Sequence, residues 1–280
     1  MNKQLATLIE LQSHRYERIM KQINEIAIRG GLQEYITYSR IWEYPWLWFQ
    51  LNQLKGHGLR IIDIGSEKSP FPWFLAMQDF RVTVSDITAN YWRIWKKASQ
   101  QLKVAVDKRI LNAQDLDLSN ASTDIYLSVS VIEHVPDKPM AIAEAARVLR
   151  PGGLLIMTFD ICEPDMGMTF PEWNGRSLTM CEFDDLFKNS PWFEPGLSEL
   201  PWNINDIPEY LSWHRTTASW HNYITGAAII KRNNRPWVEP AYKEHLRTLK
   251  GKWNTSSSVA FNSMQHGMEI IKRGIVKFGS

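Results

Sequence analysis

The stretch "IIDIGSEKSPFPWF", residues 61–74, indicates which fold the chain adopts. Apolar residues run into Asp63 and Gly65, which is typical of a short buried strand followed by a turn. Ser69 and Pro70 then favour a helix start, because serine caps helices and proline fits their first turn. A strand, a glycine turn and a helix in this order predict one unit of a parallel α/β sheet.

The same alternation continues along the chain. Further strands are expected at 80–86, 108–112, 123–130 and 154–161, and helices at 71–78, 89–102 and 138–150. Strands that alternate with helices predict an α/β fold with a Rossmann-like, doubly wound, mostly parallel sheet. Ligands of such sheets bind beyond the carboxyl ends of the strands.

The flanking segments predict additions to this core. Residues 3–29 have helical periodicity, and Pro45 is expected to break 35–54 before an aromatic helix. We predict an N-terminal helical cap at 1–55 and a core at 56–232 that ends in the strand "HNYITGAAIIKR". The core should carry a substrate-side insertion at about 162–206, irregular except for a helix at 180–189. Residues 233–280 are expected to form a C-terminal extension, either helical or a linker to a further domain.

Composition excludes several function classes. The 280 residues carry a formal net charge of +2, with no basic run typical of a nucleic-acid surface. No segment resembles a signal peptide or a membrane span, and two cysteines without a metal or redox pattern suit a reducing cytoplasm. We therefore expect a cytoplasmic protein with neither a nucleic-acid nor a membrane partner. The 13 tryptophans indicate either an aromatic ligand surface or lid, or plain core packing.

Two acids at strand ends point to a cofactor. Asp63 ends the first strand and Asp86 the second, and an acid at the second position accepts hydrogen bonds from ribose hydroxyls. A dinucleotide and S-adenosylmethionine would both use it. Pro70 and Pro72 cannot donate backbone hydrogen bonds to a pyrophosphate, and Glu67 adds negative charge. The turn therefore favours S-adenosylmethionine, with NAD(P) as the alternative.

Residues from about 59 to 160 also resemble a known family. The stretches "IIDIGSEKSPF", "VTVSDIT", "NAQDLDLSNASTDIYLSVSVIEHVPD" and "EAARVLRPGGLLIMTF" are similar to class I S-adenosylmethionine-dependent methyltransferases of the small-molecule type 11 kind. The "SRIWEYPW" run at 39–46 is similar to a lead-in of some bacterial members from glycan or natural-product clusters.

The resemblance implies roles at the methionine and ribose end of the cofactor. Gly65, with Ile64 and Ser66, would bind the methionine part through the backbone. Asp63 would lie near its ammonium group, and Asp86 would bind the ribose. The chain departs from the family pattern in lacking the further glycines of this turn.

Four more positions carry over by the same resemblance. Ile87 would pack on the adenine face, and Ala113 would offer its backbone N–H to adenine. Asn112 stands where the family usually has aspartate, and its carbonyl can still accept from the adenine amino group. Ser130 would present its carbonyl to the methionine ammonium.

Catalytic and acceptor-binding candidates lie on both sides of this core. His134 is the candidate base, since its ordinary pKa suits proton removal, although Glu133–His134 could instead only order its loop. Arg215, beside His214, is a candidate for binding a substrate carboxylate. The remaining substrate-binding candidates, each of which could instead be structural, are Tyr38, Arg40, Trp42, His221 and Tyr223.

These observations predict a methyltransferase that needs no metal. The expected reaction is O-methylation of a small molecule or short peptide in bacterial specialised metabolism. Carboxyl methylation of a peptide natural product and sugar O-methylation are the alternatives within that class. An NAD(P)-dependent oxidoreductase and a non-catalytic cofactor-binding protein are alternatives outside it. The sequence leaves the acceptor atom and the oligomeric state open.

Overall fold

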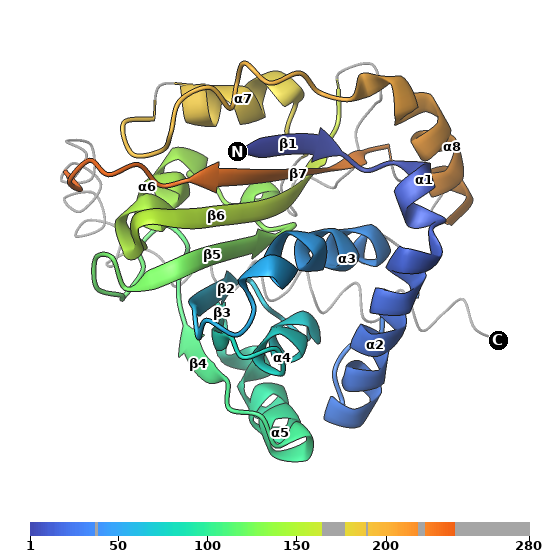
Figure 1. The fold of residues 1–280 in the computed structure, drawn as a ribbon, viewed down its shortest axis with the longest axis vertical. Coiled ribbons are helices and arrows are strands. Elements are labelled where there is room, and N and C mark those ends of the chain that lie inside the picture. The colour runs from blue at the N-terminus through green and yellow to red at the C-terminus, as the bar shows by residue number, and fades with distance from the viewer. Residues whose placement is uncertain (37–38, 164–176, 189, 218–221, 239–280) are drawn as a thin grey trace, which may run out of the picture. The chain divides into compact units, whose positions relative to one another are not determined.

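The computed structural model describes residues 1–36, 39–163, 177–188, 190–217 and 222–238 (Figure 1). Met1–Trp237 form one compact unit, and Val238–Ser280 a second. The fold and the site described below belong to the first unit. The extension expected at 233–280 lies mostly outside the described residues.

A seven-stranded sheet runs through the first unit in the order β1-β7-β6-β5-β2-β3-β4. The strands are β1 (Asn2–Leu5), β2 (Arg60–Ile64), β3 (Arg81–Asp86), β4 (Asp107–Ile110), β5 (Thr123–Val129), β6 (Leu149–Ile161) and β7 (Ile224–Lys231). β4, β3, β2, β5 and β6 pair in parallel, while β7 is antiparallel to β6. The predicted Rossmann-like, mostly parallel sheet is confirmed.

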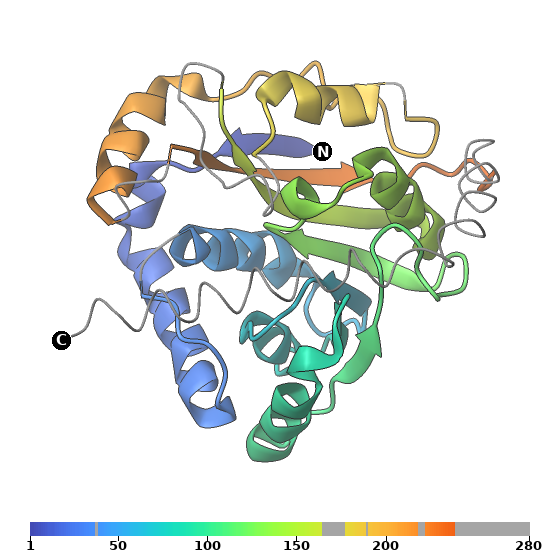
Figure 2. The same cartoon turned by 180° about the vertical axis from the view of Figure 1, so that it is seen from behind.

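Helices cover both faces of this sheet. They are α1 (Leu8–Leu11), α2 (His14–Gly30), α3 (Arg40–Leu51), α4 (Phe71–Ala76), α5 (Trp92–Leu102), α6 (Lys138–Val148), α7 (Met180–Lys188) and α8 (Ile207–Thr217). α3 and α4 lie in front of the sheet in Figure 1, and α6 comes to the front when the molecule is turned in Figure 2. Helices on both faces make the sheet doubly wound.

The first residues of the chain form a strand, where the sequence predicted a helix from residue 3. β1 pairs antiparallel with β7, from Asn2 opposite Ile229 to Leu5 opposite Gly226. The amide of Leu5 also donates to Asn203 Oδ1 (2.6 Å). The helical periodicity was misleading because partners more than 190 residues away satisfy this backbone.

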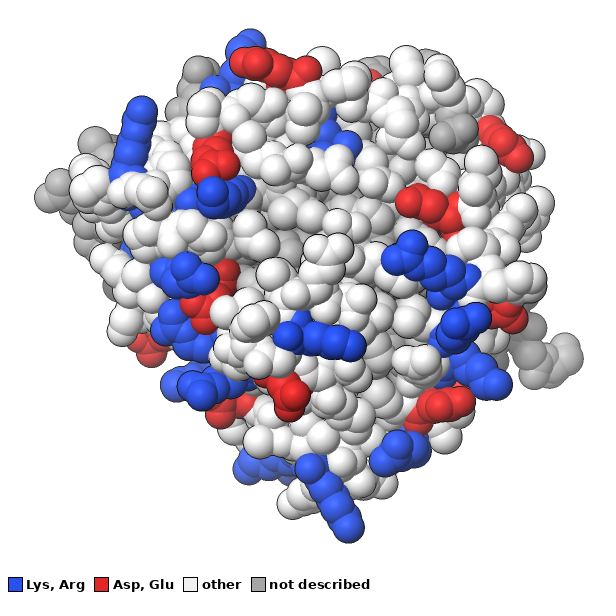
Figure 3. Space-filling model, viewed as in Figure 1, with Lys and Arg blue, Asp and Glu red and all other residues white. Residues whose placement is uncertain are grey.

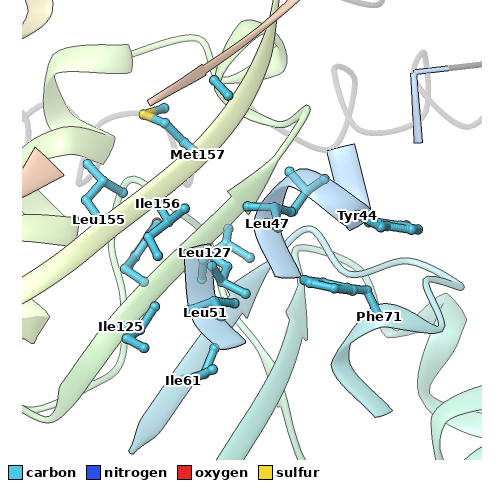
Figure 4. Packing of buried hydrophobic residues seen from close by; sticks show 14 of the residues in the cluster. Tyr44, Leu47, Leu51, Ile61, Phe71, Ile125, Leu127, Leu155, Ile156 and Met157 are labelled. Carbon is cyan, nitrogen blue, oxygen red and sulfur yellow. The ribbon is translucent and has the colours of Figure 1, made fainter. Parts of the chain in front are cut away.

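Pro45 lies inside α3 rather than breaking it. Proline removes one N–H from the helical ladder, but this helix is buried around most of its circumference, and packing compensates for the lost bond. Figure 4 shows Leu47 and Leu51 of α3 against Leu127 of the sheet. The ring of Tyr44 stacks on Phe71, with centroids 5.0 Å apart.

Most tryptophans of the N-terminal half serve as core packing. Trp42, Trp46, Trp73 and Trp95 are fully buried. In these cases packing accounts for the tryptophans, and an open aromatic ligand surface does not. On the face seen in Figure 3, acidic and basic side chains are interspersed.

Candidate cofactor site

The turn after β2 leaves room only for glycine at its centre. Gly65 has φ +70°, and a Cβ atom there would lie 2.6 Å from Cγ2 of Val131. The next residue, Ser66, is tied into the sheet, since its amide donates to the Ser85 carbonyl (2.8 Å) and its hydroxyl donates to the Asp63 carbonyl (3.0 Å). The hydrogen bond of the Ser66 amide is therefore already made to β3. This argues against the backbone contact with methionine expected for Ser66.

A small cavity opens beside this turn. Asp63, Gly65 and Glu67 line it from the turn, and Tyr35 and Arg40 line it from the N-terminal segment. Arg40 was expected among the acceptor-binding residues, but it faces the turn at the end of β2. The N-terminal segment thus forms part of the predicted cofactor site.

Three acids surround this turn, and each is costly to ionise. Burial raises the pKa of Asp63 to about 7, although a hydrogen bond from Ser66 and the charge of Arg40 pull it down. Burial likewise raises the pKa of Glu67, against the opposing charge of Arg40. Burial also raises the pKa of Asp86, whose Oδ1 accepts the Thr88 amide at 3.0 Å. A cationic ligand would stabilise the ionised forms of all three acids.

Arg40 belongs to a buried network that the sequence did not predict. Its guanidinium pairs with Glu43 and donates to Ser130 Oγ (2.7 Å). Oε1 of Glu43 accepts the hydroxyls of Ser130 (2.5 Å) and Thr158 (2.6 Å). The network joins α3 to the ends of β5 and β6. The Arg40-x-x-Glu43 spacing within an aromatic helix was the available signal, since residues three apart meet on one helix face.

A second pair of acids lies next to this network. The amide of Asp160 donates to Glu133 Oε1 (3.3 Å), and both side chains are buried. Within the described part of the chain, Glu133 Oε2 and Asp160 Oδ1 have no hydrogen-bond partner. Burial raises the pKa of Glu133 to about 8, and burial together with the charge of Glu133 raises that of Asp160 well above its usual range. Both carboxyl groups are therefore harder to ionise than free acids.

The residues expected at the adenine end follow β3 and β4. Ile87 is 64% exposed just beyond β3. Asn112 Oδ1 accepts the Gln114 amide at 3.0 Å, and Ala113 lines a small apolar cavity with Val131. The adenine-binding roles of Ile87, Asn112 and Ala113 stay predictions.

The catalytic candidates occupy different surroundings. His134 ends a short 3₁₀ turn after β5 and is exposed. Arg215 is exposed on α8, where its Nε donates to Asn222 Oδ1 (3.1 Å). The binding of a substrate carboxylate by Arg215 stays a prediction.

The other acceptor-binding candidates divide into two groups. Trp42 is fully buried and donates to Glu10 Oε2 (2.8 Å), and Tyr223 is fully buried just before β7. Both pack inside the protein, and this argues against the acceptor contacts expected of them. Tyr38, His221 and the side chain of His214 lie outside the described residues.

Residues 62–157 match the family model described as a methyltransferase domain. This stretch contains the glycine turn, both strand-end acids and the turn after β5. Residues 62–157 therefore belong to a methyltransferase domain.

Curated relatives match this domain over part of their length. The ubiquinone biosynthesis O-methyltransferases of Paramagnetospirillum magneticum and Mesorhizobium japonicum are 33% and 30% identical over 99 and 100 residues. These stretches are 35% and 36% of this chain, and 39% and 40% of the two relatives. The chain thus covers about two fifths of the relatives it matches.

Solved structures share the fold of the methyltransferase domain over more of the chain. The [4+2]-cyclase SpnF matches with a TM-score of 0.55 at 15% identity, covering 80% of this chain and 97% of that one. PH0226 from Pyrococcus horikoshii matches with a TM-score of 0.52 at 17% identity, covering 79% and 100%. At these identities the likeness concerns the fold alone.

The described residues lack a metal-binding cluster and a membrane-spanning helix. They hold no group of three or more His, Cys, Asp or Glu side chains placed to bind a metal ion. None of their helices is long and apolar enough to cross a membrane.

Proposed function

We propose that the protein transfers the methyl group of S-adenosylmethionine to an oxygen atom of a small molecule. The observation that carries this proposal is the charge of the cavity at Gly65. Asp63 and Glu67 line it, with Asp86 close by and Arg40 opposite. S-adenosylmethionine brings a sulfonium, an ammonium and a single carboxylate, which suits three acids and one guanidinium. A pyrophosphate would bring two negative charges to the same acids, which disfavours NAD(P).

The residues present fit the cofactor as follows. Asp63 would bind the ammonium group, Arg40 the carboxylate and Asp86 the ribose hydroxyls. The Ser130 carbonyl would receive a second ammonium hydrogen. The bound cofactor supplies a methyl group on a sulfonium, whose departure as a neutral thioether makes alignment the main catalytic requirement.

The names of the curated relatives support the proposed acceptor atom. The curated relatives are named O-methyltransferases, which favours oxygen as the methylated atom. We propose that the acceptor is a small molecule or short peptide of bacterial specialised metabolism. Methyl ester formation on a peptide carboxylate and sugar O-methylation are the alternatives. A cytoplasmic location also stays a prediction.

A hydroxyl acceptor must lose a proton, and His134 near the end of β5 is the candidate to receive it, because its side chain is exposed. Glu133 is fully buried beside Asp160 and its pKa is raised to about 8, which makes it unsuited to this role. A carboxylate acceptor needs no base. His134→Ala should therefore slow methylation of a hydroxyl by about 10²-fold or more and leave methylation of a carboxylate unchanged. Full activity of the variant on a hydroxyl acceptor excludes His134 as the base.

A cofactor-binding protein without methyl transfer is the second candidate. The fold neighbour SpnF is a [4+2]-cyclase, so this fold alone does not decide the reaction. Turnover with radiolabelled S-adenosylmethionine distinguishes the two. Phenols, sugars and peptides with free carboxylates serve as the acceptor panel, with methyl esters of the peptides as controls. Label transfer to any free acceptor supports the proposal, and binding without transfer across the panel favours the second candidate.

Calorimetry tests the choice of cofactor directly. We expect S-adenosylhomocysteine to bind, and NAD⁺ and NADP⁺ to give no heat at the same concentrations. Binding of a dinucleotide, without binding of S-adenosylhomocysteine, would refute the proposal and restore the oxidoreductase.

A further inference from the structure

Glu43 is a fully buried carboxylate that connects three parts of the chain. It lies on α3, accepts from Ser130 after β5 and from Thr158 in β6, and pairs with Arg40 one helical turn away. A buried carboxylate is unfavourable unless its oxygens are bonded and its charge is paired. Here both conditions are met, by the hydroxyls of Ser130 and Thr158 and by Arg40, which lines the cavity at Gly65.

The turn at Ser130 needs such support. Ser130 has φ +47°, a left-handed conformation that is uncommon for residues other than glycine. Its amide donates to the Thr158 carbonyl (3.0 Å) and approaches Thr158 Oγ1 (3.2 Å), while its hydroxyl donates to Glu43. Strained backbone persists where its surroundings fix it from several sides, and it concentrates at functional sites.

Arg40 is held by the same carboxylate. Its guanidinium lines the cavity beside Asp63 and also contacts Ser130. Glu43 thus holds in place both groups that would face the amino-acid end of the cofactor. The Arg40 guanidinium would bind the carboxylate, and the Ser130 turn would bind the ammonium group.

We propose that Glu43 is a positioning residue, which fixes Arg40 and the Ser130 turn so that they bind the amino-acid part of S-adenosylmethionine. This inference rests on the proposed function. Glu43 itself does not line the cavity at Gly65. Its removal should therefore weaken binding of the amino-acid part and leave binding of the adenosine part unchanged.

Two ligands distinguish binding of the amino-acid part from binding of the adenosine part. S-adenosylhomocysteine carries the amino-acid group, and 5′-methylthioadenosine has the same adenosine and thioether without it. In Glu43→Gln the side-chain carbonyl can still accept from Ser130 and Thr158, but the charge that holds Arg40 is lost. We expect calorimetry to show a Kd for S-adenosylhomocysteine raised about tenfold or more, since hydrogen bonds to charged groups are the strong ones. The Kd for 5′-methylthioadenosine should change less than about twofold.

Glu144→Gln is the matched control. Glu144 is also buried, pairs with Arg147 three residues along its helix, and accepts the Leu116 amide at 2.8 Å. This pair lies on α6 and does not line the cavity at Gly65. A general loss of stability should appear in both variants, whereas the ratio of the two Kd values should change only in Glu43→Gln.

The outcomes separate the two proposals. A wild-type protein that binds neither probe overturns the proposed function and this inference together. A wild-type protein that binds S-adenosylhomocysteine, with an unchanged ratio of Kd values in Glu43→Gln, overturns this inference alone. If Glu43→Gln does not fold, Thr158→Val removes one hydroxyl donor to Glu43 and is judged by the same ratio.

Discussion

Replacing Asp63 with asparagine should stabilise the folded protein by an amount that grows with pH. Burial raises the pKa of Asp63 from 3.8 to about 7. Between these values the folded protein holds a proton on this carboxyl that the unfolded chain has released, so stability falls as the pH rises. Each pH unit in this window costs about 1.4 kcal/mol of unfolding free energy. Asparagine has the same shape and no charge to desolvate.

The size of the effect follows from these two pKa values. Between pH 5 and pH 7 the unfolding free energy of the wild type should fall by about 2 kcal/mol because of Asp63. This is slightly less than the full effect of two pH units, because Asp63 in the folded protein begins to ionise near pH 7. The unfolding free energy is measured at pH 5, 6 and 7 by urea unfolding, with tryptophan fluorescence as the signal. The difference in unfolding free energy between variant and wild type should increase by that amount. The other buried acids are present in both proteins and cancel.

Asp124→Asn is the control for this experiment. Asp124 is also mostly buried, and burial alone would raise its pKa, but hydrogen bonds from Arg60 and Arg150 lower it to about 2. Folded and unfolded states are both ionised at this position above pH 5, so its effect should be the same at all three pH values. Equal pH dependence in wild type and Asp63→Asn would refute the assignment of Asp63 as a buried acid with a raised pKa.

Asp63→Asn should weaken cofactor binding although it stabilises the fold. Asp63 is the proposed partner of the cofactor ammonium, and asparagine offers it a carbonyl without a charge. We expect Asp63→Asn to be more stable at pH 7 and yet to bind S-adenosylhomocysteine more weakly. A variant that is both more stable and an equally good binder would leave Asp63 without a role in cofactor binding.

Three further predictions concern single residues. Asp86→Ala should raise the Kd for S-adenosylhomocysteine strongly in calorimetry while thermal unfolding shows an intact fold; unchanged affinity would remove the ribose role. Burial raises the pKa of Glu133 to about 8, so Glu133→Gln should become increasingly stable relative to wild type from pH 5 to pH 8, and a constant difference in urea unfolding would contradict the buried acid pair. Gly65→Ala should cost more unfolding free energy than Gly56→Ala, because both have positive φ but only Gly65 lies against Val131. Equal losses would show that backbone strain alone matters there.

Local sequence signals determined the central part of this fold. The apolar run into Asp63, the acid at Asp86 and the alternation of strands with helices predicted a parallel sheet with a ligand site at its carboxyl edge. These features depend on residues close together in the chain, where strand and helix periodicities and turn residues act directly. The cofactor was predicted in the same way, from the prolines and the acid after Gly65.

Tertiary structure alone decided how the N-terminal segment is used. β1 is a strand because β7 offers it a partner, and Pro45 stays in a helix because the core packs around α3. The buried network of Arg40, Glu43 and Ser130 joins residues up to 90 positions apart. The helix and strand periodicities of a sequence cannot predict such a contact. A carboxylate in an aromatic helix is a surface residue by default, and only the hydroxyls and the guanidinium that the fold brings to Glu43 make its burial possible.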